Sequence, residues 1–151
     1  MKVFMLMREN RKHYYLLGQV LDRIEAFCRE HDSDADPKSL SQRVEQDYVS
    51  EEPCFCLLVA EWNGKVSGHL LASLDTWMGR KFLTVVQMAI DKHSGVPVAE
   101  LRAGLDMLTS WGELNMAVGI QALVPPGGAH ARRLRRFYGL QDHKILMRKE
   151  F

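Results

Sequence analysis

Residues 57–70 decide the fold, and they are Leu57-Leu58-Val59-Ala60-Glu61-Trp62-Asn63-Gly64-Lys65-Val66-Ser67-Gly68-His69-Leu70. Two apolar runs lie on either side of Asn63-Gly64, the dipeptide best suited to place two consecutive residues at positive φ in a tight turn. The stretch therefore predicts a β-hairpin, with strands over about residues 54–62 and 65–74. Gly68 lies inside the second strand and marks a bulge or a close approach of another group to the backbone.

Two amphipathic helices are predicted before this hairpin, after a short first strand over residues 2–7. Apolar residues recur at helical spacing from Arg11 to His31, and charged residues such as Arg23 are expected on the opposite face. A second helix is expected to begin at Pro37, because Asp36 can cap free amides and proline is tolerated in a first turn.

The chain after the hairpin alternates strands and helices. The predicted segments are a polar turn over 75–81, a strand over 82–90 that is apolar on both faces, a loop over 91–97, a helix from 98, a strand over 118–124, a short basic helix over 129–138 and a last strand over 145–147. The strand over 82–90 is the expected centre of the sheet, because only a central strand is buried on both faces.

Composition fits one globular domain over residues 1–151, with 46% hydrophobic and 26% charged residues. The formal charge of +1 gives no general attraction to nucleic acid. No apolar run approaches the ~20 residues that span a bilayer, so we expect neither a nucleic-acid nor a membrane partner. The three cysteines are an odd number without a disulfide framework, and reduced thiols in the cytoplasm are expected.

The order of these segments resembles the GNAT acetyltransferase superfamily over about residues 50–151. The hairpin is similar to a run common in that superfamily, val-ala-glu-x-x-gly-lys-x-x-gly, which falls on Val59, Ala60, Glu61, Gly64, Lys65 and Gly68. The resemblance implies an α/β (α+β) fold, in which a mixed, mostly antiparallel sheet has helices on both faces and parts between its fourth and fifth strands. It also implies acetyl transfer from acetyl-CoA (coenzyme A) to an amine by direct attack.

A coenzyme A site is implied along the central strand and at the start of the next helix. In the superfamily, backbone groups of the fourth strand bind the pantetheine arm, and a loop of the form Arg/Gln-x-x-Gly-x-Gly/Ala holds the pyrophosphate on free amides. The predicted contacts are Met88, Ala89, Ile90, Gly95, Val96, Val98 and Ala99.

The loop departs from the superfamily pattern. Aligned on Gly95, the motif has Pro97 where Gly or Ala belongs, which removes one amide donor. Aligned instead from Trp111, it has Ala99 and Leu101 at the two small positions. Both placements stay open, as does the interpretation that this segment is an ordinary strand-to-helix turn.

Two side chains are candidates for the chemistry. Tyr138 lies about a helical turn from the position, here Arg135, where the superfamily often has a tyrosine that protonates the departing thiolate. Packing of its ring, with the hydroxyl at the surface, is the alternative. Gln87 lies beside the expected thioester position, where a polar group can orient an amine. The cysteines and histidines form no complete ligand set, so no metal is predicted, and His93 is the histidine we single out.

A second hypothesis is a protein of the same fold that has a degenerate coenzyme site and acts by binding another protein. Pro97, Arg135 and Gly128, which takes the place of a superfamily asparagine, favour it. The trimmed fold and methionine-rich composition resemble acetyltransferase-like proteins of bacteriophages. The partners implied are a small-molecule amine, a protein acceptor, a second copy or a host protein. A third hypothesis is a phosphate-binding module that uses the same helix start.

Overall fold

The computed structural model describes residues 1–31, 35–122 and Arg132. Its elements are β1 (Lys2–Met5), α1 (Arg11–His31), α2 (Pro37–Tyr48), β2 (Phe55–Trp62), β3 (Lys65–Trp77), β4 (Arg80–Ile90), α3 (Val98–Leu114) and β5 (Ile120–Ala122). Each strand and helix predicted before residue 123 is present. The last predicted strand, and the predicted basic helix apart from Arg132, lie outside the described residues.

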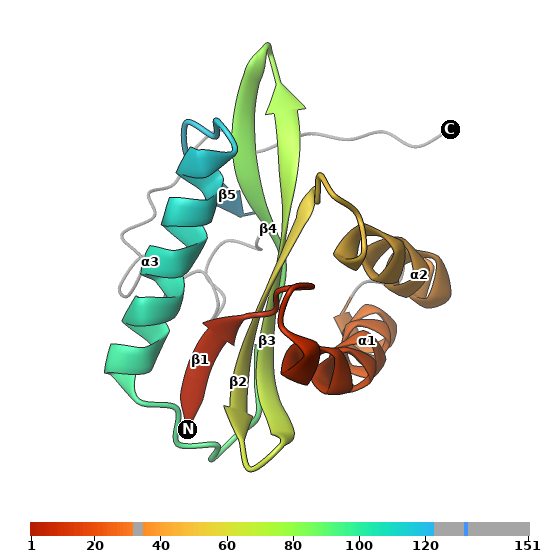
Figure 1. Cartoon of the computed structure of the whole chain (residues 1–151), viewed down its shortest axis with the longest axis vertical. Helices are drawn as coiled ribbons and strands as arrows, with labels where there is room; N and C mark the ends of the chain where they lie inside the picture. Colours follow the sequence, from red (N-terminus) through yellow and green to blue (C-terminus); the bar gives the residue numbers. More distant parts are fainter. Residues whose placement is uncertain (32–34, 123–131, 133–151) are drawn as a thin grey trace.

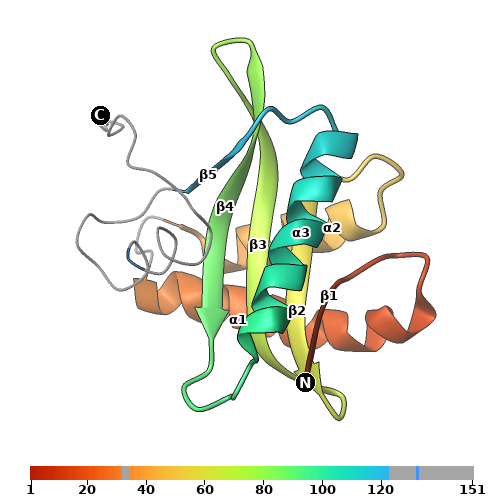
Figure 2. The ribbon, with the colours of Figure 1, turned by 90° about the vertical axis from the view of Figure 1, so that its left-hand side faces the viewer.

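The described strands form one sheet in the order β1-β2-β3-β4-β5, in which neighbours are antiparallel except for the parallel pair β4 and β5. Helices α1 and α2 cover one face and α3 covers the other (Figure 1), and the view turned by 90° shows the sheet between them (Figure 2). The predicted fold class is confirmed. None of the described helices is long and apolar enough to cross a bilayer.

The hairpin between β2 and β3 has the predicted turn. Asn63 and Gly64 have φ values of 49° and 78°, which only a residue tolerant of the left-handed region adopts without strain. Gly68 meets both expectations for a strand glycine. The register shifts beside it, and a Cβ at Gly68 would lie 3.2 Å from the carbonyl oxygen of Ala89. The backbones of β3 and β4 therefore approach closely here.

The predicted polar turn over residues 75–81 is wrong. Strands β3 and β4 continue to Trp77 and Arg80, which pair with each other, and the turn is only Met78-Gly79. Both turn residues have positive φ, 51° and 78°, as in the first hairpin. The end of this hairpin is largely exposed, so its strands carry polar residues and resemble a loop in composition.

The core has two layers, one on each face of the sheet. Val20 and Ile24 of α1 are fully buried against Leu71 and Val59, and Leu108 of α3 is buried with Leu83 on the other face. The second helix begins as predicted: Asp36 Oδ1 accepts hydrogen bonds from the amides of Lys38 and Ser39 at 3.1 and 3.3 Å.

Helix α3 approaches β1 closely because Gly104 has no side chain. A Cβ there would lie 2.7 Å from Val3 Cγ1, which is closer than carbon atoms pack. We expect Gly104→Ala to lower the free energy of unfolding by about 1–3 kcal/mol through overpacking, even though alanine favours helix by about 1 kcal/mol. Urea unfolding measures this change.

Gly18→Ala is the matched control. Gly18 is an exposed residue of α1, and nothing lies within 4 Å of an added Cβ. This variant is expected to gain about 0.5–1 kcal/mol from helix propensity alone. A similar gain in Gly104→Ala would contradict the close packing of α3.

Candidate functional site

The candidate site begins at the end of β4. The Asp91 N–H donates to the Ser67 carbonyl at 2.8 Å, and the register pairs His69 with Ala89. Backbone groups in an antiparallel strand point alternately to the two sides. The N–H and C=O of Ala89 therefore point toward β3, whereas those of Met88 and Ile90 point to the β5 side. Of the three predicted strand contacts, Met88 and Ile90 can offer backbone groups to a ligand.

A bulge in β4 lies just before Met88 and Ile90. The register pairs Leu71 with Gln87 but Ala72 with Val85, so Val86 is an extra residue, and it is 41% exposed. Strand β5 pairs with β4 at Leu83–Val85 within the described residues. The predicted parting of β4 and β5 would begin after Ala122 and lies outside these residues.

The start of α3 lies at the same end of the sheet as the end of β4 (Figure 2). Pro97 is the N-cap residue and provides no side-chain cap. The first amides bonded within the helix are those of Glu100 and Leu101, which donate to the Pro97 carbonyl at 3.0 and 3.1 Å. The preceding amides, of Val98 and Ala99, have no partner among the described residues. Unpaired amides at the positive end of a helix attract anions.

The conformation of the loop before α3 distinguishes between the two possible alignments of the motif. Gly95 has a φ of 71°, a conformation that suits glycine, but it lies before the helix together with Val96. Of the four predicted loop contacts, only Val98 and Ala99 contribute amides to the first helical turn. The placement counted back from Trp111 therefore fits the helix start better than the one aligned on Gly95.

Glu100 is a residue that the sequence analysis missed. Its Oε2 accepts a hydrogen bond from the Val3 N–H at 2.9 Å, which ties the first turn of α3 to β1. It is also the one acidic residue in that turn. A negative charge at this position opposes the binding of an anion.

Arg23 was predicted to lie on the solvent-facing side of α1, but its side chain turns toward the end of β4. Its guanidinium binds the Asp91 carboxylate through two hydrogen bonds of 2.9 and 3.2 Å, and the Arg23 side chain is 22% exposed. A further hydrogen bond of 3.4 Å runs to the Ser67 carbonyl. These contacts fix the point at which the chain leaves β4 for the loop. No local sequence signal predicts these contacts, because Arg23 and Asp91 are 68 positions apart.

Several solved structures of similar fold are named as acetyltransferases, whereas no family profile and no curated protein matches the chain. A probable acetyltransferase has a TM-score of 0.69 at 8% identity, with 100% of this chain and 97% of that one covered. AAC(6')-Iy in complex with the bisubstrate analogue CoA-S-monomethyl-acetylneamine has a TM-score of 0.67 at 13% identity, over 99% and 98% of the chains. A ribosomal-protein-alanine N-acetyltransferase from Brucella melitensis biovar Abortus 2308 has 0.62 at 14%, over 100% of both.

The fold is that of the GNAT acetyltransferases.

Gln87, which was predicted to orient an amine, lies in the interior of this fold. It is 3% exposed and faces α1. Its amide nitrogen donates to the Ile24 carbonyl at 3.3 Å and to Cys28 Sγ at 3.2 Å, and its oxygen lies 3.0 Å from His69 Nε2. Both ends of the amide are therefore already engaged. In this structure Gln87 joins α1 to the sheet.

His69 is the second residue that the sequence analysis missed, and it is 4% exposed. Burial lowers the pKa of its imidazole below 6.5, and the nearby Arg23 charge lowers it further, while the hydrogen bond to Gln87 and the Asp91 charge act in the opposite direction. The available signal was a histidine directly before the apolar run Leu70-Leu71-Ala72, at a position that the alternation of β3 turns inward.

The His69 environment predicts a pH dependence of stability. The unfolded chain binds a proton at His69 more readily than the folded chain, so the free energy of unfolding is complete above pH 6.5 and falls as pH drops below it. Urea unfolding of the wild type at about pH 7.5 and about pH 5.5 is expected to show this loss, and His69→Gln a smaller one. His93→Gln, an exposed loop variant, should keep the wild-type difference. An unchanged difference in His69→Gln would contradict the prediction.

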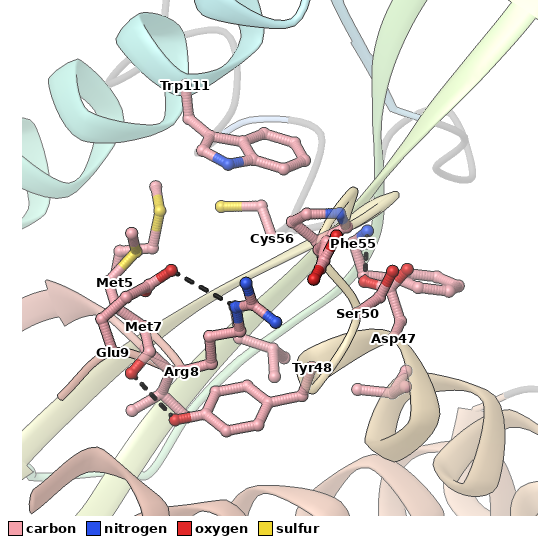
Figure 3. A pocket seen from close by; sticks show the side chains of 15 residues that line it. Met5, Met7, Arg8, Glu9, Asp47, Tyr48, Ser50, Phe55, Cys56 and Trp111 are labelled. Carbon is pink, nitrogen blue, oxygen red and sulfur yellow. Dashed lines mark hydrogen bonds and ion pairs between the residues drawn. The ribbon is translucent and has the colours of Figure 1, made fainter. Parts of the chain in front are cut away.

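A separate recess lies between the ends of β1 and α2 (Figure 3), with Trp111 on one side and Tyr48 on the other. Its volume is about 80 Å³, whereas ligand pockets have about 300–1,000 Å³. The Tyr48 hydroxyl donates to the Met7 carbonyl at 3.0 Å, and Arg8 donates to the Val49 carbonyl at 3.1 Å. The recess is too small for a coenzyme, and none of the predicted site residues lines it. Tyr138 lies outside the described residues.

Proposed function

We propose that this protein transfers an acetyl group from acetyl-CoA to an amine. The observation that carries the proposal is that two sets of backbone groups lie at one end of the fold without a partner among the described residues. The amides of Val98 and Ala99 begin α3, and the backbone groups of Met88 and Ile90 point away from β3. The GNAT fold supports this assignment, because a solved structure of that fold holds a coenzyme A analogue.

The described residues fit coenzyme A in two respects. The amides of Val98 and Ala99 bind the pyrophosphate at the positive end of the helix. Met88 and Ile90 pair with the amides of the pantetheine arm as a neighbouring strand would. Acetyl-CoA supplies an activated thioester. We assign Tyr138 the protonation of the departing thiolate, as the resemblance implies, and the acceptor is a small-molecule or protein amine in the cytoplasm.

A GNAT-fold protein that binds another protein, with a degenerate coenzyme site, is the second candidate. Two observations favour it. Pro97 provides neither an amide nor a side-chain cap, and Glu100 brings a carboxylate to the first turn of α3. Both reduce the attraction of the helix start for a diphosphate.

Thermal unfolding with acetyl-CoA, desulfo-coenzyme A, ATP or buffer alone separates the candidates. Either coenzyme at a hundredfold excess over its dissociation constant should add about 2.7 kcal/mol, which raises Tm by about 5–10 °C. No shift with either would refute acetyl transfer. A shift with ATP of the same size would indicate a general phosphate site.

Turnover is measured as release of the coenzyme A thiol in the presence of a panel of amines that includes an aminoglycoside and an N-terminal alanine peptide. Thiol release that depends on one amine supports transfer and identifies the acceptor class. A coenzyme-induced shift in Tm without thiol release supports the second candidate.

A further inference from the structure

The Arg23 side chain joins three segments that are far apart in the sequence. Its guanidinium donates to both oxygens of the Asp91 carboxylate, at 2.9 and 3.2 Å, and to the Ser67 carbonyl at 3.4 Å. The Asp91 N–H donates to the same carbonyl at 2.8 Å. Helix α1, strand β3 and the end of β4 therefore meet at one carboxylate and one carbonyl oxygen.

Asp91 is the residue at which the chain leaves β4 for the loop before α3. Both of its backbone groups are hydrogen-bonded, because its carbonyl accepts from the Ser94 N–H at 3.2 Å. The loop then passes through His93 and Gly95, which have φ values of 62° and 71°. The left-handed conformation is unfavourable for a residue with a side chain, such as His93, and it persists where the surrounding structure fixes it. Asp91 is the fixed point from which this loop starts.

The place of Asp91 in the chain connects it to the proposed coenzyme site. Ile90, which is assigned to the pantetheine arm, directly precedes it. The loop that begins at Asp91 leads to the amides of Val98 and Ala99. A displacement of Asp91 therefore moves the strand end and the loop together. The two sets of backbone groups can bind one coenzyme molecule only while their separation is kept.

Arginine suits this position better than lysine does. Its planar guanidinium matches both oxygens of a carboxylate, whereas a lysine ammonium is a point charge on a flexible stem. The Arg23 side chain is 22% exposed and that of Asp91 is 47% exposed. Because partly exposed ion pairs contribute little to global stability, we expect this pair to matter chiefly for the geometry of the chain around it.

We propose that Arg23 is a positioning residue of the coenzyme site, which holds Asp91 so that the end of β4 and the start of α3 bind one acetyl-CoA molecule together. For its ligand the proposal rests on the proposed acetyl transfer. Arg23 acts through Asp91 and not on the reacting atoms.

The anchoring of the loop is tested first without coenzyme. In Arg23→Gln, hydrogen exchange of the Asp91 and Ser94 amides is expected to be about 3- to 10-fold faster, because the ion pair no longer holds the turn closed. Arg29→Gln is the matched control, since it makes the same change on the same helix. Arg29 is 59% exposed and pairs with Glu25 at 3.6 Å, so both exchange rates should stay at the wild-type value. Unchanged rates in Arg23→Gln would overturn the anchoring.

The affinity for acetyl-CoA, measured by isothermal titration, tests the positioning. Arg23→Gln is expected to bind about 3- to 10-fold more weakly, because the binding-competent arrangement is populated for a smaller fraction of the time. Arg29→Gln should bind as the wild type does. A loss of global stability leaves the affinity of the folded protein unchanged, so this measurement separates positioning from a merely structural role. With the amine found above, KM for acetyl-CoA should rise by the same factor while kcat stays unchanged. Wild-type affinity in Arg23→Gln would overturn the proposal.

Asp91→Asn separates positioning from simple neutralisation of charge. If Arg23 holds Asp91 in place, Asp91→Asn also weakens binding, and the double variant Arg23→Gln/Asp91→Asn binds no more weakly than either single variant. If Arg23 only neutralises the carboxylate, Asp91→Asn binds the anionic coenzyme at least as tightly as the wild type. That result would also overturn the proposal.

A wild type that binds no acetyl-CoA would refute the proposed function together with the role of Arg23 in coenzyme binding. The exchange rates would still decide whether Arg23 anchors the loop, so the two failures are distinguishable.

Discussion

Replacing Val98 by proline is expected to weaken the binding of acetyl-CoA by about 10- to 100-fold, with little change in stability. Val98 is the first residue of α3, where proline is well tolerated because the amide has no partner within the helix. Pro97 has φ −63° and ψ 145°, a conformation compatible with a following proline. The variant therefore deletes one proposed pyrophosphate donor and leaves the helix intact. A hydrogen bond to a charged group contributes about 1.5–3 kcal/mol, which gives the expected loss.

Val98→Ala is the matched control, because it removes the same side chain and keeps the amide. Isothermal titration with acetyl-CoA measures the affinity of both variants, and urea unfolding measures their stability. Equal affinities of Val98→Pro and Val98→Ala would show that this amide does not bind the coenzyme. A loss in both would implicate the valine side chain.

Replacing Leu71 by alanine is expected to lower the free energy of unfolding by about 2–5 kcal/mol, because the truncation leaves a cavity in the core. Leu71 lies near the middle of β3 and is fully buried, in the cluster that packs α1 and α2 onto the sheet. Each kcal/mol lowers Tm by about 2–4 °C in a domain of this size, so Tm should fall by about 10 °C. Calorimetry measures Tm and shows whether unfolding stays cooperative.

Leu114→Ala is the control for the same chemical change at the surface. Leu114 ends α3 and is 82% exposed, so its truncation should change stability by less than about 0.5 kcal/mol. Similar losses in the two variants would contradict the position of Leu71 in the core.

Short-range signals account for the success of the element predictions. Asn63-Gly64 determines a turn by itself, because its backbone preference does not depend on the rest of the chain. Asp36 and Pro37 likewise determine a helix start. The polar turn predicted over residues 75–81 was wrong because the local signals in this segment are weak. Met78-Gly79 is a weaker turn signal, and the flanking strands have no core face to give them an alternating pattern.

The candidate site was predicted only in part. Its backbone portion, the start of α3 and the end of β4, follows from the segment order and the resemblance to a known family. Gln87 was placed on the correct strand, but the bulge at Val86 and the packing of α1 decide that its amide is enclosed. Glu100 gave no signal, because its partner is an amide of β1 that lies 97 residues away.

By itself the sequence determined which segments are helices, strands and turns, since those preferences act over a few residues. Only the tertiary structure decided that Arg23 reaches Asp91 and that His69 lies against Gln87 beneath α1. These contacts depend on strand register and on how a helix lies on the sheet. A shift of one residue in either would direct each side chain elsewhere.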